Sequence, residues 1–301
     1  MGETLVAEAV VLGIDFGISE IAVGLCDLSG QRLADAVVHP VAAQGARWNL
    51  ELGIAAGQHL LRRDAGRLRL VAIGAATFGV PGEHRIEFAE AIAEWGDLAL
   101  ASELRRGFGC PAVAVLGDLA AAAGAEARQG ALRGCDPALY VRVGDDVAIA
   151  PILGGRVVTG ANGAAGAIGA AARTDRRDLA EIAERPGASR PASAACAEIA
   201  WRLEAVSAAR HAPARLEQAI EEFSETLAFQ LVNLSLSLDP ERIALGGELA
   251  SWWLRIEATL SHALKSCVPH PPELVPAAFP REGALIGALA AGLEQVPPNT
   301  R

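Results

Sequence analysis

Residues 10–17 read VVLGIDFG, and residues 18–26 continue directly as ISEIAVGLC. Two apolar runs flank a lone carboxylate, Asp15, and a glycine, Gly17, which predicts a buried strand, a tight turn and a returning strand. A carboxylate at such a turn can hold a hydrated metal ion beside bound phosphates, and the glycine lets the backbone approach them. The alternative is an aspartate that only caps the hairpin, and this stretch alone is compatible with both.

Composition narrows the class of protein. The chain of 301 residues fits two domains of ordinary size, and 51% apolar residues provide for a sizeable core. The net charge of −10 argues against binding to nucleic acid and against an anionic membrane surface. We expect a soluble, cytoplasmic protein, because no apolar run is long and clean enough to span a bilayer and no basic segment precedes the first apolar run. The five scattered cysteines lack a Cys-x-x-Cys pair and predict free thiols.

The first half of the chain alternates strands and helices, which is the pattern of an α/β protein. Strands are expected at 31–41, 68–75 and 111–116, and helices at 48–65, 91–107 and 119–131. Pro81-Gly82 marks a turn beyond the carboxyl end of a strand, and Asp118 follows the strand at 111–116.

The second half begins with strands again, at 139–143, 147–153 and 156–158, and this second meander echoes the first. Helices are expected at 194–208, 216–238, 249–264 and 283–294, with one more strand at 243–245. Residues 173–191 are rich in charge and proline and are expected to be flexible, and 269–280 is expected to be a proline-rich connection.

Several stretches then come in the order of one family. They are GIDFG at 13–17, VPG at 80–82, Asp118 with its alanine run, VTGANGAAGAIG at 158–169, DPERIALGG at 239–247 and Gly287-Ala288. Together they resemble the ROK family of bacterial sugar kinases, sugar-responsive repressors and uncharacterised open reading frames, from about Val10 to Glu294. The resemblance implies an α/β, two-domain actin-like ATPase (ribonuclease H-like) fold with a cleft between the domains. The implied domains are 1–115 with a returning helix at about 283–297, and 116–282.

The resemblance also implies roles for single residues. Asp15 falls where family kinases keep an aspartate near the magnesium-bound phosphates, and Asp118 where they keep the general base that takes the proton from the sugar hydroxyl. The remaining implied contacts are Gly17, Ser19 and Gly144 for the phosphates, Gly246 and Gly247 for the adenosine, and Pro81, Gly82 and Asn162 for the substrate. An N-cap for the helix that starts at Leu119 is an alternative for Asp118 that is compatible with catalysis. Asn162 has the simpler alternative of serving its turn.

The chain departs from the family pattern both in the turns that bind the nucleotide phosphates and among the residues that contact the sugar. Ile18 replaces a glycine and Glu20 follows Ser19 in the first phosphate turn, and Asp145-Asp146 follows Gly144 in the second. Two carboxylates oppose a triphosphate unless metal ions intervene, although an exposed acidic hairpin turn is the simpler interpretation. Residues that read the sugar in family kinases are replaced by Gly117, Ala167 and Ala170. The cysteine cluster that holds structural zinc is missing, so no zinc and no resident metal site are expected.

Three functions follow from these observations. The first is an ATP-dependent sugar kinase that uses Mg-ATP, with altered motifs at both ligands. The second is a non-catalytic relative that senses a sugar or another metabolite, without a DNA-binding domain of its own and without direct contact to nucleic acid, since about nine residues precede the first strand. The third is a scaffold that acts through oligomerisation, because family members often form homodimers.

Overall fold

A computed structural model describes residues 8–63, 68–82, 84–89, 91–143, 147–166, 206, 213–247 and 252–298. The chain divides into two compact units, which are described separately. The first comprises the residues up to Ala125 together with those from Glu282 onward, and the second comprises Glu126–Arg281. Helix α3, Asp118–Gln129, begins in the first unit and ends in the second.

The first unit is built on a five-stranded sheet with the order β3-β2-β1-β4-β7. The strands are β1 (Glu8–Phe16), β2 (Ile21–Asp27), β3 (Arg32–Val38), β4 (Leu68–Thr77) and β7 (Val113–Gly117). The opening meander is antiparallel, whereas β1, β4 and β7 run parallel and end at the same edge of the sheet. A small hairpin of β5 (Val80–Pro81) and β6 (Ile86–Glu87) follows β4.

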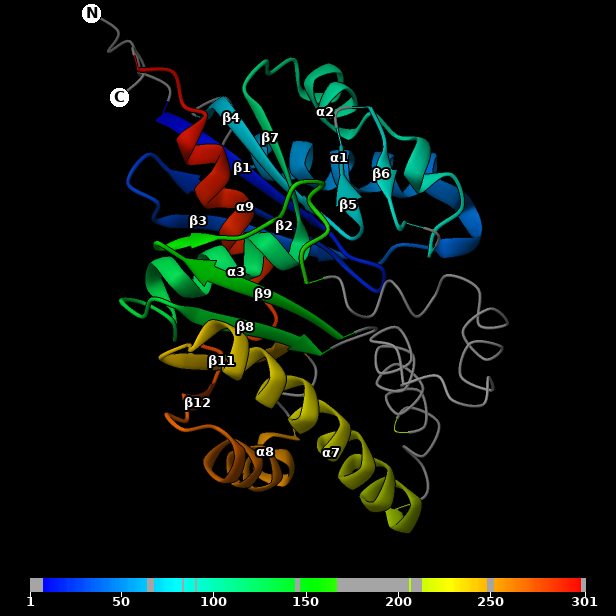
Figure 1. The fold of residues 1–301 in the computed structure, drawn as a ribbon. Helices are drawn as coiled ribbons and strands as arrows, with labels where there is room; N and C mark the ends of the chain where they lie inside the picture. Colours follow the sequence, from blue (N-terminus) through cyan, green and yellow to red (C-terminus); the bar gives the residue numbers. More distant parts are fainter. Residues whose placement is uncertain are drawn as a thin grey trace, which may run out of the picture. The chain divides into compact units, whose positions relative to one another are not determined.

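The two faces of this sheet pack against different helices. Val10, Leu12, Ile14 and Phe16 point into a core with α1 (Gly45–Arg62) and α2 (Leu100–Phe108). The alternate residue Val11 packs instead with Leu285 and Leu289 of α9 (Gly283–Glu294). Figure 1 shows α9, in red, lying along the strands of this unit. Strand alternation therefore decides which residues of β1 face α9.

The helix expected over 91–107 is shorter in the structure. Only Leu100–Phe108 is α-helical, and the preceding residues form turns and the short 3-10 helix η2, Trp95–Asp97. The helix is interrupted at Trp95, whose side chain is buried to 1% exposure. The residue before it, Glu94, has a left-handed backbone conformation with a φ of 65°, which an α-helix does not allow. A further 3-10 turn, η1 (Ala42–Gln44), leads into α1, which begins three residues earlier than expected.

The second unit repeats the same sheet plan. Its strands are β8 (Ala138–Val143), β9 (Val147–Leu153), β10 (Arg156–Val157), β11 (Arg242–Gly247) and β12 (Glu273–Pro276), in the order β10-β9-β8-β11-β12. As in the first unit, the first strand pairs antiparallel with the second and parallel with the fourth. Helices α7 (Pro213–Leu238) and α8 (Trp253–Cys267) supply the side chains that pack on one face, among them Phe223, Leu231 and Ile256.

Strand β12 was not expected, because it lies within the stretch 269–280 that the sequence predicts to be a connection. Its last residue is Pro276, and proline is tolerated at the edge of a sheet, where one side of the strand needs no donor. The carboxylate of Glu126, buried to 0% exposure, accepts N–H bonds from Ala278 at 3.1 Å and Phe279 at 2.6 Å. This buried carboxylate fixes the chain that follows β12.

Two expected segments cannot be compared with the structure. The flexible stretch at 173–191 lies outside the described residues, and so does the helix at 194–208 except for Val206. Within the described part of the chain, no helix combines the length and the apolar character that a membrane crossing requires.

Helix α9 approaches strand β4 so closely that a glycine is required. A Cβ atom on Gly74 would overlap the carbonyl oxygen of Ala288, and one on Gly292 would lie 2.8 Å from the backbone nitrogen of Gly74. Backbone atoms cannot move aside as the end of a flexible side chain can. Gly74 and Gly292 therefore set the distance between helix and sheet.

We predict that Gly74→Ala lowers the free energy of unfolding by about 3 kcal/mol or more, because the added methyl group overlaps backbone. Gly24→Ala is the matched control, since its Cβ would also face α9 but lies 3.4 Å from the nearest atom, Cδ2 of Leu285. Urea titration of both variants measures the difference. Equal stabilities of the two variants would contradict the close contact.

Candidate functional site

The turn between β1 and β2 is tight and ordered. Gly17 N–H donates to the carbonyl of Glu20 at 3.0 Å, and a Cβ on Gly17 would lie 2.6 Å from that same oxygen. Glycine is thus required here by close approach, because none of the residues 17–20 has a positive φ. Ile18 packs against the core of the first unit, while Ser19 and Glu20 are exposed. The branched side chain of Ile18 therefore turns toward the core, and the exposed part of the turn belongs to Ser19 and Glu20.

Asp15 lies on the face of the sheet that α9 covers. Gly13 faces α9, because a Cβ on it would lie 2.6 Å from Cγ of Leu289. Asp15 is two residues further along the strand and therefore lies on the same face. Asp15 pairs with Ala22 of β2 and Ala76 of β4, so its neighbours on this face are small. The carboxylate is half-buried, with its Oδ1 atom out of contact with solvent. Asp15 is therefore held near the carboxyl edge of the sheet.

Asp118 follows the carboxyl end of β7, two strands away from β1. Gly117 pairs with Thr77, which pairs with Phe16, so the two aspartates flank the same edge at a lateral distance of about 10 Å, two strand spacings. Asp118 is the first residue of α3, and its Oδ1 accepts the N–H of Leu119 at 2.7 Å. An N-cap side chain accepts the N–H of the second or third helical residue, so this bond to the next residue is not the capping bond that the sequence suggested, but it does orient the carboxylate at the start of the helix.

The β5–β6 hairpin lies beside Gly117. A Cβ on Gly117 would be 3.4 Å from the carbonyl oxygen of Gly79 and 3.7 Å from Cδ of Pro81. Gly82 N–H closes the hairpin by donating to Arg85 O at 2.8 Å. The structure therefore brings Pro81 next to the residue that precedes Asp118, and it brings Gly82 into the same hairpin.

An aromatic cluster of Phe16, Phe78 and Trp95 packs at this edge of the sheet. Trp95 stacks on Phe78 with ring centroids 5.2 Å apart and meets Phe16 at 5.4 Å. The indole Nε1 of Trp95 donates to Oγ1 of Thr77 at 2.9 Å, and this hydroxyl is placed 3.0 Å from Phe78 O. Since Phe16 and Thr77 are the last residues of β1 and β4, the cluster fixes the strand ends that carry Asp15 and lead to the hairpin.

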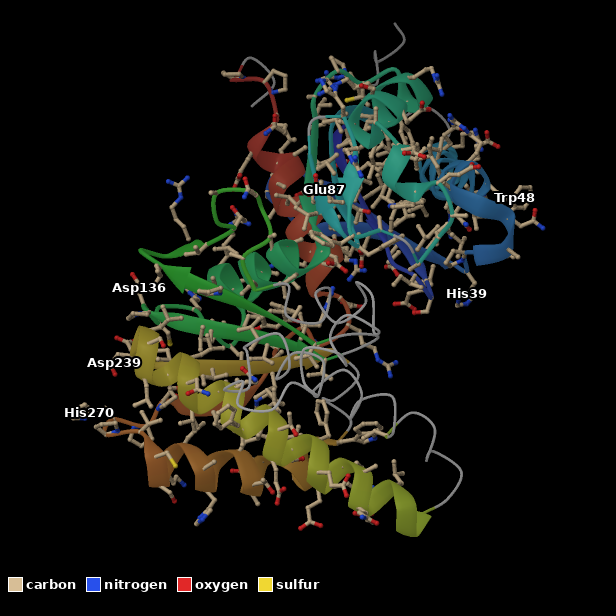
Figure 2. All side chains as sticks on the ribbon, turned by 45° about the vertical axis from the view of Figure 1, so that its right-hand side comes forward. His39, Trp48, Glu87, Asp136, Asp239 and His270 are labelled. Carbon is tan, nitrogen blue, oxygen red and sulfur yellow. The ribbon has the colours of Figure 1, made fainter. Side chains whose placement is uncertain are left out.

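His39 is a neighbour of the first turn that sequence analysis missed. It follows β3, and its Nδ1 lies 3.4 Å from the carbonyl oxygen of Ser19. Figure 2 labels His39 at this end of the first unit and Trp48 on α1. The pairing of Ile21 with Val38 brings His39 to the turn, and only knowledge of the β2–β3 register would have revealed it.

In the second unit, Gly246 and Gly247 end β11 beside the end of β8. Gly246 pairs with Arg142 and Gly247 with Val143. A Cβ on Gly246 would lie 2.5 Å from the hydroxyl of Tyr140, and one on Gly247, whose φ is 82°, would overlap Val143 O. Packing alone therefore accounts for both glycines; Gly246 is buried, and Gly247 at the end of the strand is partly exposed.

The other two expected contacts of this unit are less informative. Gly144 lies outside the described residues, as do Asp145 and Asp146. Asn162 is exposed in the turn that Ala165 N–H closes on Thr159 O at 3.0 Å. The strand β9 anchors that turn, because Ile149 N–H donates to Gly166 O at 2.9 Å. The simpler interpretation, that Asn162 serves its turn, agrees with this position.

Metal-binding side chains are not clustered in the described part of the chain. Among the described residues, no group of three or more His, Cys, Asp or Glu side chains is placed to hold an ion. The buried thiol of Cys26 is a poor nucleophile, because its pKa is raised to about 11. Burial is the main cause of this shift, and the negative charge of Asp27 is the second. Single carboxylates near strand ends suit Mg²⁺ that arrives already bound to phosphates.

Comparison with known proteins places the chain in a family. The model of the ROK family matches residues 11–294, which is nearly the whole sequence. No curated protein sequence matches the chain.

Three solved structures illustrate the likeness. The ROK hexokinase from Thermus thermophilus is 24% identical, with a TM-score of 0.66 over 95% of this chain and 99% of that one. A ROK glucokinase from Streptomyces griseus, in complex with glucose and AMPPNP, is 18% identical, with a TM-score of 0.67 over 95% and 99%. A ROK transcriptional regulator, a homolog of the E. coli MLC protein, is 17% identical, with a TM-score of 0.68 over 96% of this chain and 78% of that one. At these identities the likeness shows the fold, which is α/β and actin-like.

We predict that Thr77→Val lowers the free energy of unfolding by about 1–3 kcal/mol, because it leaves the buried indole N–H of Trp95 without its acceptor. Thr77→Ser keeps the hydroxyl and serves as the control, with a smaller loss. Urea denaturation followed by tryptophan fluorescence measures both. If the valine variant were as stable as the serine variant, the hydrogen bond would not support the strand ends.

Proposed function

Because the chain belongs to the ROK family, we propose that it transfers a phosphoryl group from ATP to a hydroxyl of a small sugar. The observation that carries the proposal is the position of Asp15 and Asp118, which flank the same edge of one parallel sheet segment, with the Pro81 hairpin beside Gly117. Phosphoryl transfer depends on positioning and charge stabilisation, and one well-placed carboxylate is enough to orient the attacking hydroxyl.

Asp118 is the proposed base. Its hydrogen bond from Leu119 N–H fixes the carboxylate at the start of α3, so that a sugar hydroxyl next to the β5–β6 hairpin can donate its proton to it. Pro81 and Gly82 would form part of the wall around the sugar. The glucose bound to the S. griseus glucokinase supports a sugar as the substrate class.

Asp15 is the proposed partner of the metal-bound phosphates. The residues present fit a magnesium ion that enters with the nucleotide, since Asp15 supplies one carboxylate near a strand end, and the described residues hold no larger cluster. When bound, the ion would neutralise the charge that develops on the transferred group. Ser19 would offer its hydroxyl as a donor in the first turn, and Gly17, whose N–H already donates to Glu20 O, would let the backbone of that turn come close to the phosphates. The backbone of Gly246 and Gly247 would lie against the adenosine.

A second candidate is a non-catalytic relative that senses a sugar or another metabolite. It is favoured by the lack of polar side chains at Gly117, Ala167 and Ala170, which leaves few groups to read hydroxyls. The likeness to a ROK transcriptional regulator is compatible with it, although the chain covers 78% of that protein. Such a protein would be stabilised by its metabolite and would show no response to Mg-ATP.

The homodimer and the cytoplasmic location also remain proposals. Helix α7 exposes Phe229 to 62% and Leu236 to 55%, and these side chains, which lie about two turns apart on the same face, support an interface. Sedimentation as a monomer at micromolar concentration would count against the dimer.

We predict that Asp118→Asn lowers the turnover of ATP with a sugar by a factor of about 10² or more, because the amide cannot accept the hydroxyl proton. A coupled assay for ADP over a panel of hexoses and N-acetylhexosamines measures it. Asp97→Asn, a change at an exposed aspartate in η2, should leave turnover unchanged. The kinase proposal fails if the wild-type chain forms no ADP with any sugar, or if the Asp118 variant is as active as the wild type.

A further inference from the structure

The two sheets of the molecule are built to the same plan, which allows positions to be matched between the units. The order β3-β2-β1-β4-β7 in the first corresponds to β10-β9-β8-β11-β12 in the second. Strand β8 therefore corresponds to β1, because each is the central strand, pairs antiparallel with the next strand and parallel with the fourth. The turn after β1 contains Gly17, and the residue after β8 is Gly144.

Arg142 is the counterpart of Asp15 in this match. Asp15 lies two residues before Gly17, between the core residues Ile14 and Phe16, and Arg142 lies two residues before Gly144, between the core residues Val141 and Val143. Strand alternation therefore places Arg142 on the face opposite the α7 and α8 core, as it places Asp15 opposite the α1 and α2 core.

The register supports the match. Asp15 is paired with Ala22 and Ala76, and Arg142 is paired with Ala148 and Gly246. Each charged side chain thus has small residues paired with it on both neighbouring strands, and Tyr140, two residues before Arg142 on the same face, reaches over Gly246. The pairing with Gly246 also places Arg142 next to the glycine pair at the end of β11.

We propose that Arg142 binds the phosphate chain of the nucleotide. The inference rests on the proposed function, because it assigns to the second unit the phosphate contact that Asp15 makes through a metal ion in the first. An arginine contacts phosphate directly, with two parallel N–H donors, whereas a carboxylate needs an intervening cation. In the second unit, the positive charge that attracts the phosphates would thus come from the guanidinium of Arg142, whereas in the first unit it would come from a metal ion.

The negative charges in the sequence that follows Arg142 are a further argument for a phosphate-binding arginine. Asp145 and Asp146 follow Gly144 in the sequence and would repel a phosphate chain. The positive charge of Arg142, which precedes Gly144 by two residues in the sequence, offsets part of that repulsion, and the partial burial of this residue strengthens its attraction for phosphate. Arg142 also interacts within the chain, and its five N–H donors suffice for a protein partner and a phosphate together.

The test is a calorimetric titration of the full chain with Mg-ATP and with inorganic tripolyphosphate, for the wild type, Arg142→Gln and Arg156→Gln. Arg156 is an exposed arginine of the same unit, at the start of β10, and is the matched control. We expect Arg142→Gln to weaken the binding of both probes at least tenfold, which is the loss of one charged hydrogen-bonding group. The Arg156 variant should bind within twofold of the wild type.

The outcomes separate the two proposals. Equal binding of ATP and tripolyphosphate by the Arg142 variant and the wild type overturns the role of Arg142 and leaves the kinase proposal standing. Binding of tripolyphosphate that depends on Arg142, without binding of ATP, supports Arg142 and overturns the use of ATP. A wild-type chain that binds neither probe overturns both.

A second measurement avoids the variant, in case Arg142→Gln fails to fold. Modification of the wild-type chain by an arginine-specific dicarbonyl reagent, followed by peptide mass spectrometry, reports the reactivity of each arginine. Tripolyphosphate should protect Arg142 at least fivefold and leave Arg156 unprotected. Equal reactivity of Arg142 with and without tripolyphosphate overturns the proposal.

Discussion

The contact of helix α9 with strand β4 is the constraint on which the first unit depends. Backbone meets backbone there, because Gly74 leaves room for the carbonyl of Ala288, and a Cβ on Gly292 would lie 2.8 Å from the backbone nitrogen of Gly74. A second contact of the same kind joins α9 to α3, where a Cβ on Gly287 would overlap the carbonyl of Ala121. Helix α9 thus contacts both the face of the sheet that bears Asp15 and the helix that begins with Asp118, and it holds the two in place.

The repetition of one sheet plan gives the molecule two equivalent strand ends with different chemistry. In the first unit the matched position is an aspartate supported by the aromatic cluster of Phe16, Phe78 and Trp95. In the second it is Arg142 beside two glycines. A carboxylate suits a hydrated cation and a guanidinium suits a bare phosphate, so in our proposal the two strand ends would contact phosphate groups through opposite charges.

Periodic patterns in the sequence predicted most of the elements, because apolar alternation and helical spacing are local properties. The helix α9 was expected at 283–294 and lies at Gly283–Glu294, and the ordered stretches of the family predicted the α/β fold. The turns around Trp95 were missed because a distant hydroxyl, that of Thr77, holds the indole. Strand β12 was missed because proline obscures a strand at the edge of a sheet. The neighbours His39 and Arg142 became visible only through strand register, which spacing along the chain does not contain.

The central claim, phosphoryl transfer to a sugar, is tested most directly by phosphorus NMR of the wild-type chain with Mg-ATP and a mixture of hexoses. The proposed chemistry predicts that the resonances of ATP give way to those of ADP and of a sugar phosphomonoester in equal amounts. Formation of inorganic phosphate alone, or an ATP spectrum that stays unchanged at high protein concentration, would contradict it. In that case the fold would serve recognition of a metabolite, without group transfer.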